Sequence, residues 1–160
     1  MHFKGFQELG IRDINNKNFT LEELENIAKN YVEQGFSVCV GSDSQKFHDK
    51  TSLVTCVAFH KPSVGGDAYY IKQKIDNKFI PTLRSRMLIE VFASINAAFE
   101  LKDFLGPNIE IHIDIGNDPK KCKTYEFKSE LTSIVLAQGY VPKIKPKSWA
   151  SHVADWFTKT

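Results

Sequence analysis

A short apolar stretch that ends in an aspartate constrains this chain more than any other feature. Residues 36–42 place Phe36, Val38 and Val40 on one face, at the spacing of two that a β-strand requires. Asp43 follows directly, where the apolar pattern stops. A carboxylate at the end of a buried strand contributes little to packing, and burying it alone would cost several kcal/mol. We therefore expect a cation, a cage of hydrogen bonds or solvent to compensate its charge.

The length and composition indicate one compact domain. The chain has 160 residues, 42% of them apolar, which is enough to build a substantial core. We predict a single domain over residues 1–160, with an N-terminal arm and helix in 1–35 and a core in 36–160. The net charge of +2 gives little indication of a polyanionic partner.

Two features of the sequence favour the cytoplasm. No stretch has the apolar length of a signal peptide or a membrane span. The cysteines are three in number, lie far apart and form no CxxC pair: Cys39, Cys56 and Cys122. Cys39 and Cys56 lie in apolar strands, so we interpret them as core residues.

The periodicity of apolar residues predicts the order of helices and strands. Thr20 and Glu23 form a capping box at the start of the first helix. Residues 44–50 are polar and resemble a turn. Three antiparallel strands followed by β/α alternation predict an α/β fold, with a mixed five-stranded sheet, helices on both faces and an extra N-terminal helix. The expected elements are helix 20–34, strands 36–42, 53–59 and 68–75, helix 82–104, strand 109–115, helix 124–138, strand 140–144 and helix 148–158.

Four acidic residues occupy positions that neither turns nor surface charge explain. Asp43 ends the first strand, and Asp114 lies near the end of the alternating strand 109–115. Glu90 lies in the long helix, on the side lined by small residues that would let the helix approach the sheet closely, and Arg86 one turn before it could pair with it. Asp155 lies in the last helix. The two central strands of a mixed sheet can be neighbours, which would bring Asp43 and Asp114 together. Helices could then present Glu90 and Asp155 to the same edge.

The chemistry of such a group predicts bound metal. Four adjacent carboxylates repel one another strongly and would not stay ionised together unaided. Hard divalent cations remove the repulsion, and oxygen ligands select Mg²⁺ or Mn²⁺ over zinc. Two such ions about 4 Å apart can activate water and stabilise the leaving oxygen in phosphodiester hydrolysis.

The order of elements and acids resembles the ribonuclease H-like superfamily over roughly residues 36–160. Locally, Gly41-Ser42-Asp43-Ser44-Gln45 and Ala154-Asp155 resemble the YkuK-like bacterial proteins. The resemblance implies that Asp43, Glu90, Asp114 and Asp155 are the metal-binding and catalytic acids. It also implies metal-dependent cleavage of a nucleic-acid backbone, with the RNA of an RNA/DNA hybrid as the usual superfamily substrate.

Several other side chains are candidates for supporting roles. His152 lies one turn before Asp155 and could assist proton transfer. His112 shares a strand face with Asp114 and is interpreted as a covered sheet residue. Trp149 and Trp156 are interpreted as core anchors of the last helix. Two basic clusters flank the acids and are candidates for phosphate contact: Lys120, Lys121 and Lys123, and Lys143, Lys145 and Lys147.

Two other functions stay open. The chain could be a non-catalytic nucleic-acid-binding module of the same fold, although carboxylates repel phosphate unless metal intervenes. It could also be a junction-resolvase-like DNA nuclease, which the sequence hardly separates from a ribonuclease. A kinase-like ATPase is disfavoured, because no glycine-rich phosphate loop is present.

Overall fold

In the part of the chain that the structure describes, helices cover both faces of a seven-stranded mixed sheet. The computed structural model describes residues 3–106 and 108–158. The sheet has the strand order β2-β1-β5-β4-β3-β6-β7. The strands are β1 (Ile11–Asp13), β2 (Asn18–Phe19), β3 (Ser37–Phe47), β4 (Lys50–Lys61), β5 (Gly65–Asp76), β6 (Glu110–His112) and β7 (Val141–Lys143). The helices are α1 (Leu21–Glu33), α2 (Leu83–Leu105), α3 (Lys128–Ala137) and α4 (Trp149–Thr158), with 3₁₀ turns η1 (Asn77–Phe79) and η2 (Lys123–Phe127).

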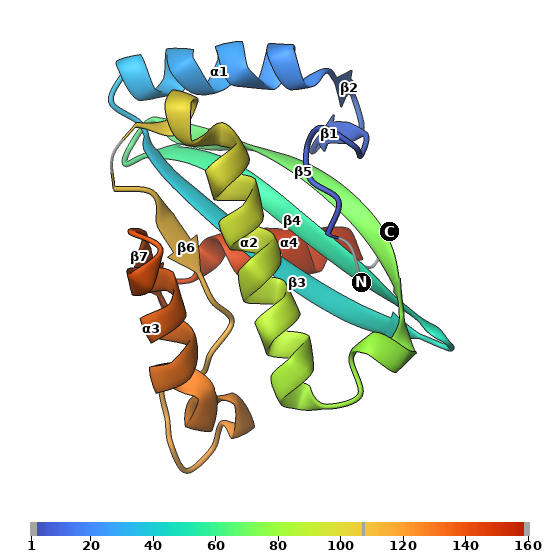
Figure 1. Cartoon of the computed structure of the whole chain (residues 1–160). Helices are drawn as coiled ribbons and strands as arrows, with labels where there is room; N and C mark the ends of the chain where they lie inside the picture. Colours follow the sequence, from blue (N-terminus) through green and yellow to red (C-terminus); the bar gives the residue numbers. More distant parts are fainter. Residues whose placement is uncertain (1–2, 107, 159–160) are drawn as a thin grey trace.

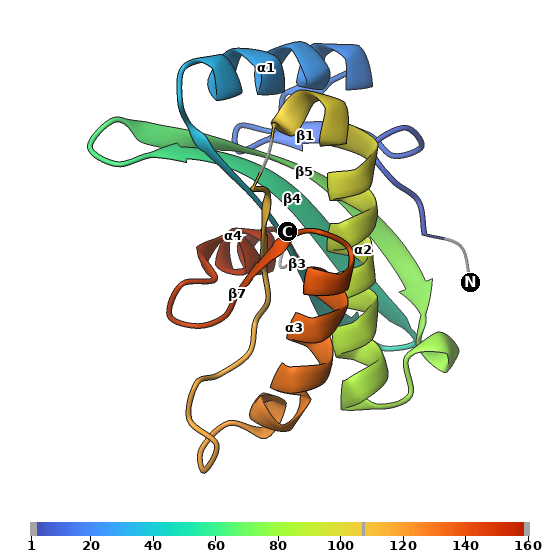
Figure 2. The same ribbon diagram turned by 60° about the vertical axis from the view of Figure 1, so that its left-hand side comes forward.

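The helices divide unequally between the two faces of the sheet, as Figures 1 and 2 show. One face packs against α1, α2 and α3, which all contribute to one large core, and Ile89 and Ala93 of α2 form a small second cluster with Leu53 and Ile75. The opposite face packs against α4, which forms a separate, smaller core. The predicted α/β class and the predicted helices on both faces are confirmed.

Strands β3, β4 and β5 form the predicted antiparallel meander, but they are longer than the sequence indicated. β3 continues through Ser44 and Gln45 to Phe47, and β4 begins at Lys50. The prediction that β3 ends at residue 42 and that residues 44–50 form a turn is therefore wrong. Antiparallel pairing satisfies the backbone of the polar segment, so the loss of the apolar pattern did not mark the end of the strand.

The other half of the sheet is parallel and shorter than expected. β6 pairs with β3 over only three positions and with β7 on its other side. In the alternating segment 109–115, ladder pairing with β3 stops at His112. The Ile115 N–H donates a 2.8 Å hydrogen bond to the Ile113 carbonyl oxygen, so the backbone turns at Asp114 and does not continue as a strand. β7 lies at the edge of the sheet, where Pro142 is tolerated because proline has no backbone N–H to donate to a further strand.

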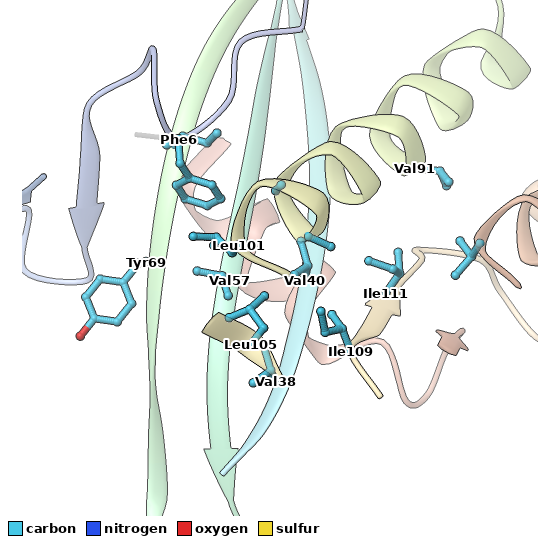
Figure 3. Close-up of a cluster of buried hydrophobic side chains, with 14 of the residues drawn as sticks. Phe6, Val38, Val40, Val57, Tyr69, Val91, Leu101, Leu105, Ile109 and Ile111 are labelled. Carbon is cyan, nitrogen blue, oxygen red and sulfur yellow. The ribbon is translucent and has the colours of Figure 1, made fainter. Parts of the chain in front are cut away.

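The core under α2 joins residues that are distant in the sequence (Figure 3). Val40 of β3 and Ile111 of β6 are fully buried side by side in register. Leu101 and Leu105 cover them from α2. Removing side chains of this size from water stabilises the fold by about 1.5–3 kcal/mol each, which fixes α2 over the centre of the sheet.

The N-terminal arm supplies the two strands that the sequence did not predict. β1 pairs with β5, and β2 pairs with β1, so the sheet has seven strands rather than five. The Glu100 carboxylate accepts hydrogen bonds from the backbone N–H groups of Phe6 (3.0 Å) and Gln7 (3.2 Å), which fixes the arm against α2. The capping box of Thr20 and Glu23 at the start of α1 is confirmed.

Two expectations about composition can be compared with the fold. Cys39 and Cys56 are buried, as predicted for core residues. Among the helices that the structure describes, none is long and apolar enough to cross a membrane.

Candidate functional site

The two central parallel strands bring Asp43 and Asp114 together. Their ladder ends at the pair formed by Gly41 and His112. Asp43 and Asp114 each lie two residues further along, so their side chains leave the same face just where the strands stop pairing. Asp43 lies within β3 and is 6% exposed, whereas Asp114 follows the end of β6 and is half-buried. A cleft at the carboxyl ends of neighbouring parallel strands is the usual place for a site in such a sheet.

Glu90 approaches the same place from α2. The Ser44 hydroxyl donates a hydrogen bond of 3.3 Å to Glu90 Oε2. One turn further on, Ser94 is buried and its hydroxyl lies 2.7 Å from that of Ser42. Ala93 and Ala97 are also buried. These small residues let α2 lie close to β3, as the sequence predicted.

Asp155 reaches Asp43 from α4, on the opposite face of the sheet. The side chains of Asp43 and Asp155 are hydrogen-bonded to each other. Gly41 makes the approach possible, because a Cβ at this position would lie 2.6 Å from the backbone nitrogen of Ser151. The start of the helix is fixed by the Ala150 N–H, which donates a 3.0 Å hydrogen bond to His112 Nδ1.

The four predicted acids therefore converge, and we call Asp43, Glu90, Asp114 and Asp155 the acid cluster. Burial, the hydrogen bond with Asp155 and the charges of Asp155 and Asp114 together raise the pKa of Asp43 to about 8, against the opposing effect of Arg86. Burial also raises the pKa of Glu90 well above its usual range, and the charge of Asp43 adds to this. These shifts follow from carboxylates that face one another in a partly dry site.

Two cations lie among the acids. Arg86 Nε donates a hydrogen bond of 2.8 Å to Ser44 Oγ, and its Nη2 donates to the Ser44 carbonyl oxygen. Arg86 thus reaches Glu90 through Ser44, rather than through the direct pair that its position one turn away predicted. Lys145 Nζ lies 2.7 Å from Asp114 Oδ1, and this contact raises the pKa of Lys145.

The side chains of the acid cluster are of the kind that binds a hard divalent cation, because all four offer carboxylate oxygens. A small cavity, with room for about one water molecule, lies between Glu90 and Asp114. The acids do not yet form a coordination shell, since Lys145 engages Asp114 and Ser44 engages Glu90. Among the side chains that the structure describes, no three His, Cys, Asp or Glu residues are placed to hold a metal ion together.

The histidine and tryptophan candidates differ in burial and in position relative to the core. His112 is buried, as predicted, and burial lowers its pKa. Its Nδ1 accepts from Ala150 while Nε2 faces Glu110 at 2.9 Å, which identifies a neutral ring with its proton on Nε2. Trp156 is 65% exposed, so its interpretation as a core anchor is wrong, whereas Trp149 packs on the smaller core. His152 belongs to α4, but its side chain lies outside the described part of the structure.

The two predicted lysine clusters lie on adjoining segments beside the acid cluster. The Ile113 N–H donates to the Lys143 carbonyl at 2.8 Å, and the Lys145 N–H donates to the Ile115 carbonyl at 3.1 Å. The loop that continues from Ile115 carries Lys120, Lys121 and Lys123, all exposed, and the other segment carries Lys143, Lys145 and Lys147. The two lysine-bearing segments therefore run side by side next to Asp114, and the Lys145 amino group contacts its carboxylate.

Arg86 and Ser44 are the members of the site whose role the sequence did not predict. Ser44 had been assigned to a turn, and Arg86 to a direct pair with Glu90. The signal was the continuation of β3: once Ser44 is a strand residue, it shares a face with Ser42 and points toward α2.

Comparison with known proteins identifies the family to which this fold belongs. The model of the family described as "Ribonuclease H-like" matches residues 20–159. The chain belongs to the ribonuclease H-like family. The matched range includes α1, which the sequence analysis left outside the resemblance.

A more specific likeness supports the expected subgroup. The chain is 27% identical over 156 residues to the "Uncharacterized protein YkuK" of Bacillus subtilis (strain 168), an alignment that covers 87% of this chain and 88% of that protein. No solved structure matches the chain significantly.

Proposed function

We propose that this ribonuclease H-like protein is a metal-dependent nuclease that hydrolyses phosphodiester bonds in nucleic acid. The observation that carries the proposal is the convergence of four carboxylates from β3, α2, the end of β6 and α4 at one edge of the sheet. A site built only to stabilise the fold would gain nothing from carboxylates that raise one another's pKa.

Each acid has a distinct part in this proposal. Asp43 and Asp114 are central, because they project from β3 and from the end of β6 at the place where these two parallel strands stop pairing. Glu90 and Asp155 complete the donor set from the two faces. Two Mg²⁺ or Mn²⁺ ions bound by these residues would supply Lewis-acid stabilisation of the attacking and leaving oxygens.

The protein's own basic residues would position the substrate. The lysines at 120, 121, 123, 143 and 147 offer ammonium groups that can bind the phosphates on either side of the scissile bond. Arg86 is held on Ser44 and would keep Glu90 in place. Water attack on phosphorus and departure of the 3′ oxygen of one nucleotide would give a 5′-phosphate and a 3′-hydroxyl. An RNA/DNA hybrid is our first choice of substrate.

A cleavage panel tests the proposal. Wild-type protein and the Asp43→Asn variant are incubated with an RNA/DNA hybrid, duplex RNA, duplex DNA and a four-way DNA junction, in Mg²⁺, Mn²⁺ or EDTA. We expect metal-dependent cutting of at least one substrate by the wild type and at least a hundredfold loss in the variant, a typical effect for removal of one electrostatic catalytic group. The substrate that is cut fastest identifies the class.

Two outcomes would replace the proposal. Cutting that is equal in both proteins would show that the acid cluster is not the active site. Tight binding without any cutting, lost when the lysines but not Asp43 are substituted, would establish a non-catalytic nucleic-acid-binding module.

A further inference from the structure

The two cations at the acid cluster differ in how firmly they are held. Arg86 donates to both the hydroxyl and the carbonyl oxygen of Ser44, so its guanidinium is fixed to β3. Lys145 lies in the segment between β7 and α4, and its described side-chain contact is the one with Asp114. The side chains of Lys145 and Asp114 are 40% and 36% exposed, although the contacting oxygen, Asp114 Oδ1, is itself buried.

The contact between Lys145 and Asp114 occupies a carboxylate oxygen that a divalent ion would bind. Asp114 Oδ1 is one of the oxygens that a divalent ion would use, and the Lys145 ammonium lies 2.7 Å from it. A divalent ion cannot bind this oxygen while the ammonium does. A half-exposed lysine on a flexible four-carbon stem can leave this oxygen, because its ammonium is readily hydrated by the water that surrounds the rest of the side chain.

We propose that Lys145 is a built-in counter-cation of the metal-free site, which competes with the divalent ion for Asp114 and is displaced when that ion binds. This inference rests on the metal site proposed above. In the metal-free protein, the positive charge of Lys145 lowers the repulsion between the carboxylates of the acid cluster. This charge interacts with Asp43 as well as with Asp114. In the loaded protein, the displaced ammonium remains near the site and opposes the charge of the ion.

Isothermal titration of Mn²⁺ into metal-free protein tests the inference. We expect Lys145→Met to bind Mn²⁺ about five- to tenfold more tightly than wild type, because one positive charge has left the site. Lys145→Arg should stay within about twofold of wild type, since the charge is kept. The matched control is Lys147→Met, an exposed lysine two residues away, which should also stay within about twofold.

A second readout does not depend on bound metal. In EDTA at about pH 8, Lys145→Met should melt at a lower temperature than both wild type and Lys147→Met, because the ionised acids have lost their counter-charge. Circular dichroism at low temperature checks that each variant is folded.

The results separate failure of the inference from failure of the proposed function. If wild type binds Mn²⁺ and Asp114→Asn does not, but Lys145→Met binds equally or more weakly, the competition is wrong and the metal site stands. If wild type and all variants fail to bind Mn²⁺, both the metal site and the inference are overturned.

Discussion

At the scale of single residues, Asp43 is the acid whose ionisation in the folded protein the site opposes through several contacts. Its carboxyl is buried, hydrogen-bonded to Asp155 and close to the charge of Asp114, and its pKa rises to about 8. The positive charge of Arg86 opposes these effects. In the absence of metal, ionisation of Asp43 is therefore unfavourable to the folded state.

This gives a prediction for pH dependence. The pKa of Asp43 is raised in the folded protein, so its contribution to stability is fully present below its unfolded value, near 3.8, and is lost as the pH rises through about 8. In EDTA, the melting temperature of wild type should fall by several degrees between about pH 5 and about pH 8, at roughly 2–4 °C per kcal/mol. Thermal denaturation followed by circular dichroism measures this.

The matched variants for that experiment are Asp43→Asn and Asp49→Asn. Asp43→Asn removes the titrating group and should flatten the profile above about pH 6. Asp49 is exposed in the β3–β4 turn, so its amide variant should follow the wild-type curve. Identical slopes in all three proteins would show that Asp43 does not govern the pH response.

The sequence predicted the acids but not all their partners. Asp43, Glu90, Asp114 and Asp155 stand out in the sequence because neither turns nor surface charge explain their positions. The contact of Lys145 with Asp114 depends on two segments, after β6 and after β7, that run side by side. No local pattern encodes such an adjacency, because it arises from the order of strands in the sheet.

At the scale of elements, the site depends on how α4 lies on the sheet. Ala150 and Ala154 are fully buried, and Cys56 Sγ lies 3.3 Å from the Ala150 carbonyl oxygen. Gly41 leaves the space that this close contact requires. Since Asp155 lies on the same helix, a shift of α4 would also separate Asp155 from Asp43.

Gly41→Ala should therefore reduce both stability and activity. The new Cβ would lie within 3.0 Å of the Ala150–Ser151 backbone, and overpacking of this kind costs about 1–3 kcal/mol. We expect a lower midpoint in urea denaturation and weaker Mn²⁺ binding. Gly10→Ala is the control, because a Cβ there meets nothing within 4 Å. Equal midpoints for the two variants would contradict the account of α4.

The sequence patterns predicted which helices and strands form more accurately than they predicted the residues at which strands end. The long helix and the meander follow from apolar periodicity, which burial enforces. The end of β3 was misplaced, because Ser44 and Gln45 are polar although β4 pairs with them. The end of β6 was also misplaced, because alternation reports exposure of the two faces and not whether a neighbouring strand continues.

At the scale of the whole molecule, charge is distributed unevenly although the net charge is only +2. The lysines at 120, 121, 123, 143, 145 and 147 lie on two adjoining segments beside the acid cluster. In Figure 1, α1 and the C-terminal end of α2 lie at the opposite end of the molecule from the loop after β6. We therefore expect a nucleic acid to bind first at that loop, next to the acid cluster.

The double substitution Lys121→Gln with Lys123→Gln tests this direction of approach. It should weaken binding of an RNA/DNA hybrid several-fold and reduce the slope of log K against log salt by about 1.5. Lys29→Gln with Lys102→Gln removes the same charge from α1 and α2 and should leave both quantities nearly unchanged. Fluorescence anisotropy at several salt concentrations measures them, and equal losses in the two proteins would indicate that only net charge matters.

The central claim is that the four acids form one binding centre for divalent cations. Its most direct test is the melting temperature of wild type and Asp43→Asn at about pH 8, in MgCl₂ and in EDTA. Mg²⁺ that binds only the folded protein must stabilise it. We predict a rise of several degrees for the wild type and little or none for Asp43→Asn, whereas no rise in the wild type, or an equal rise in both proteins, would contradict the claim.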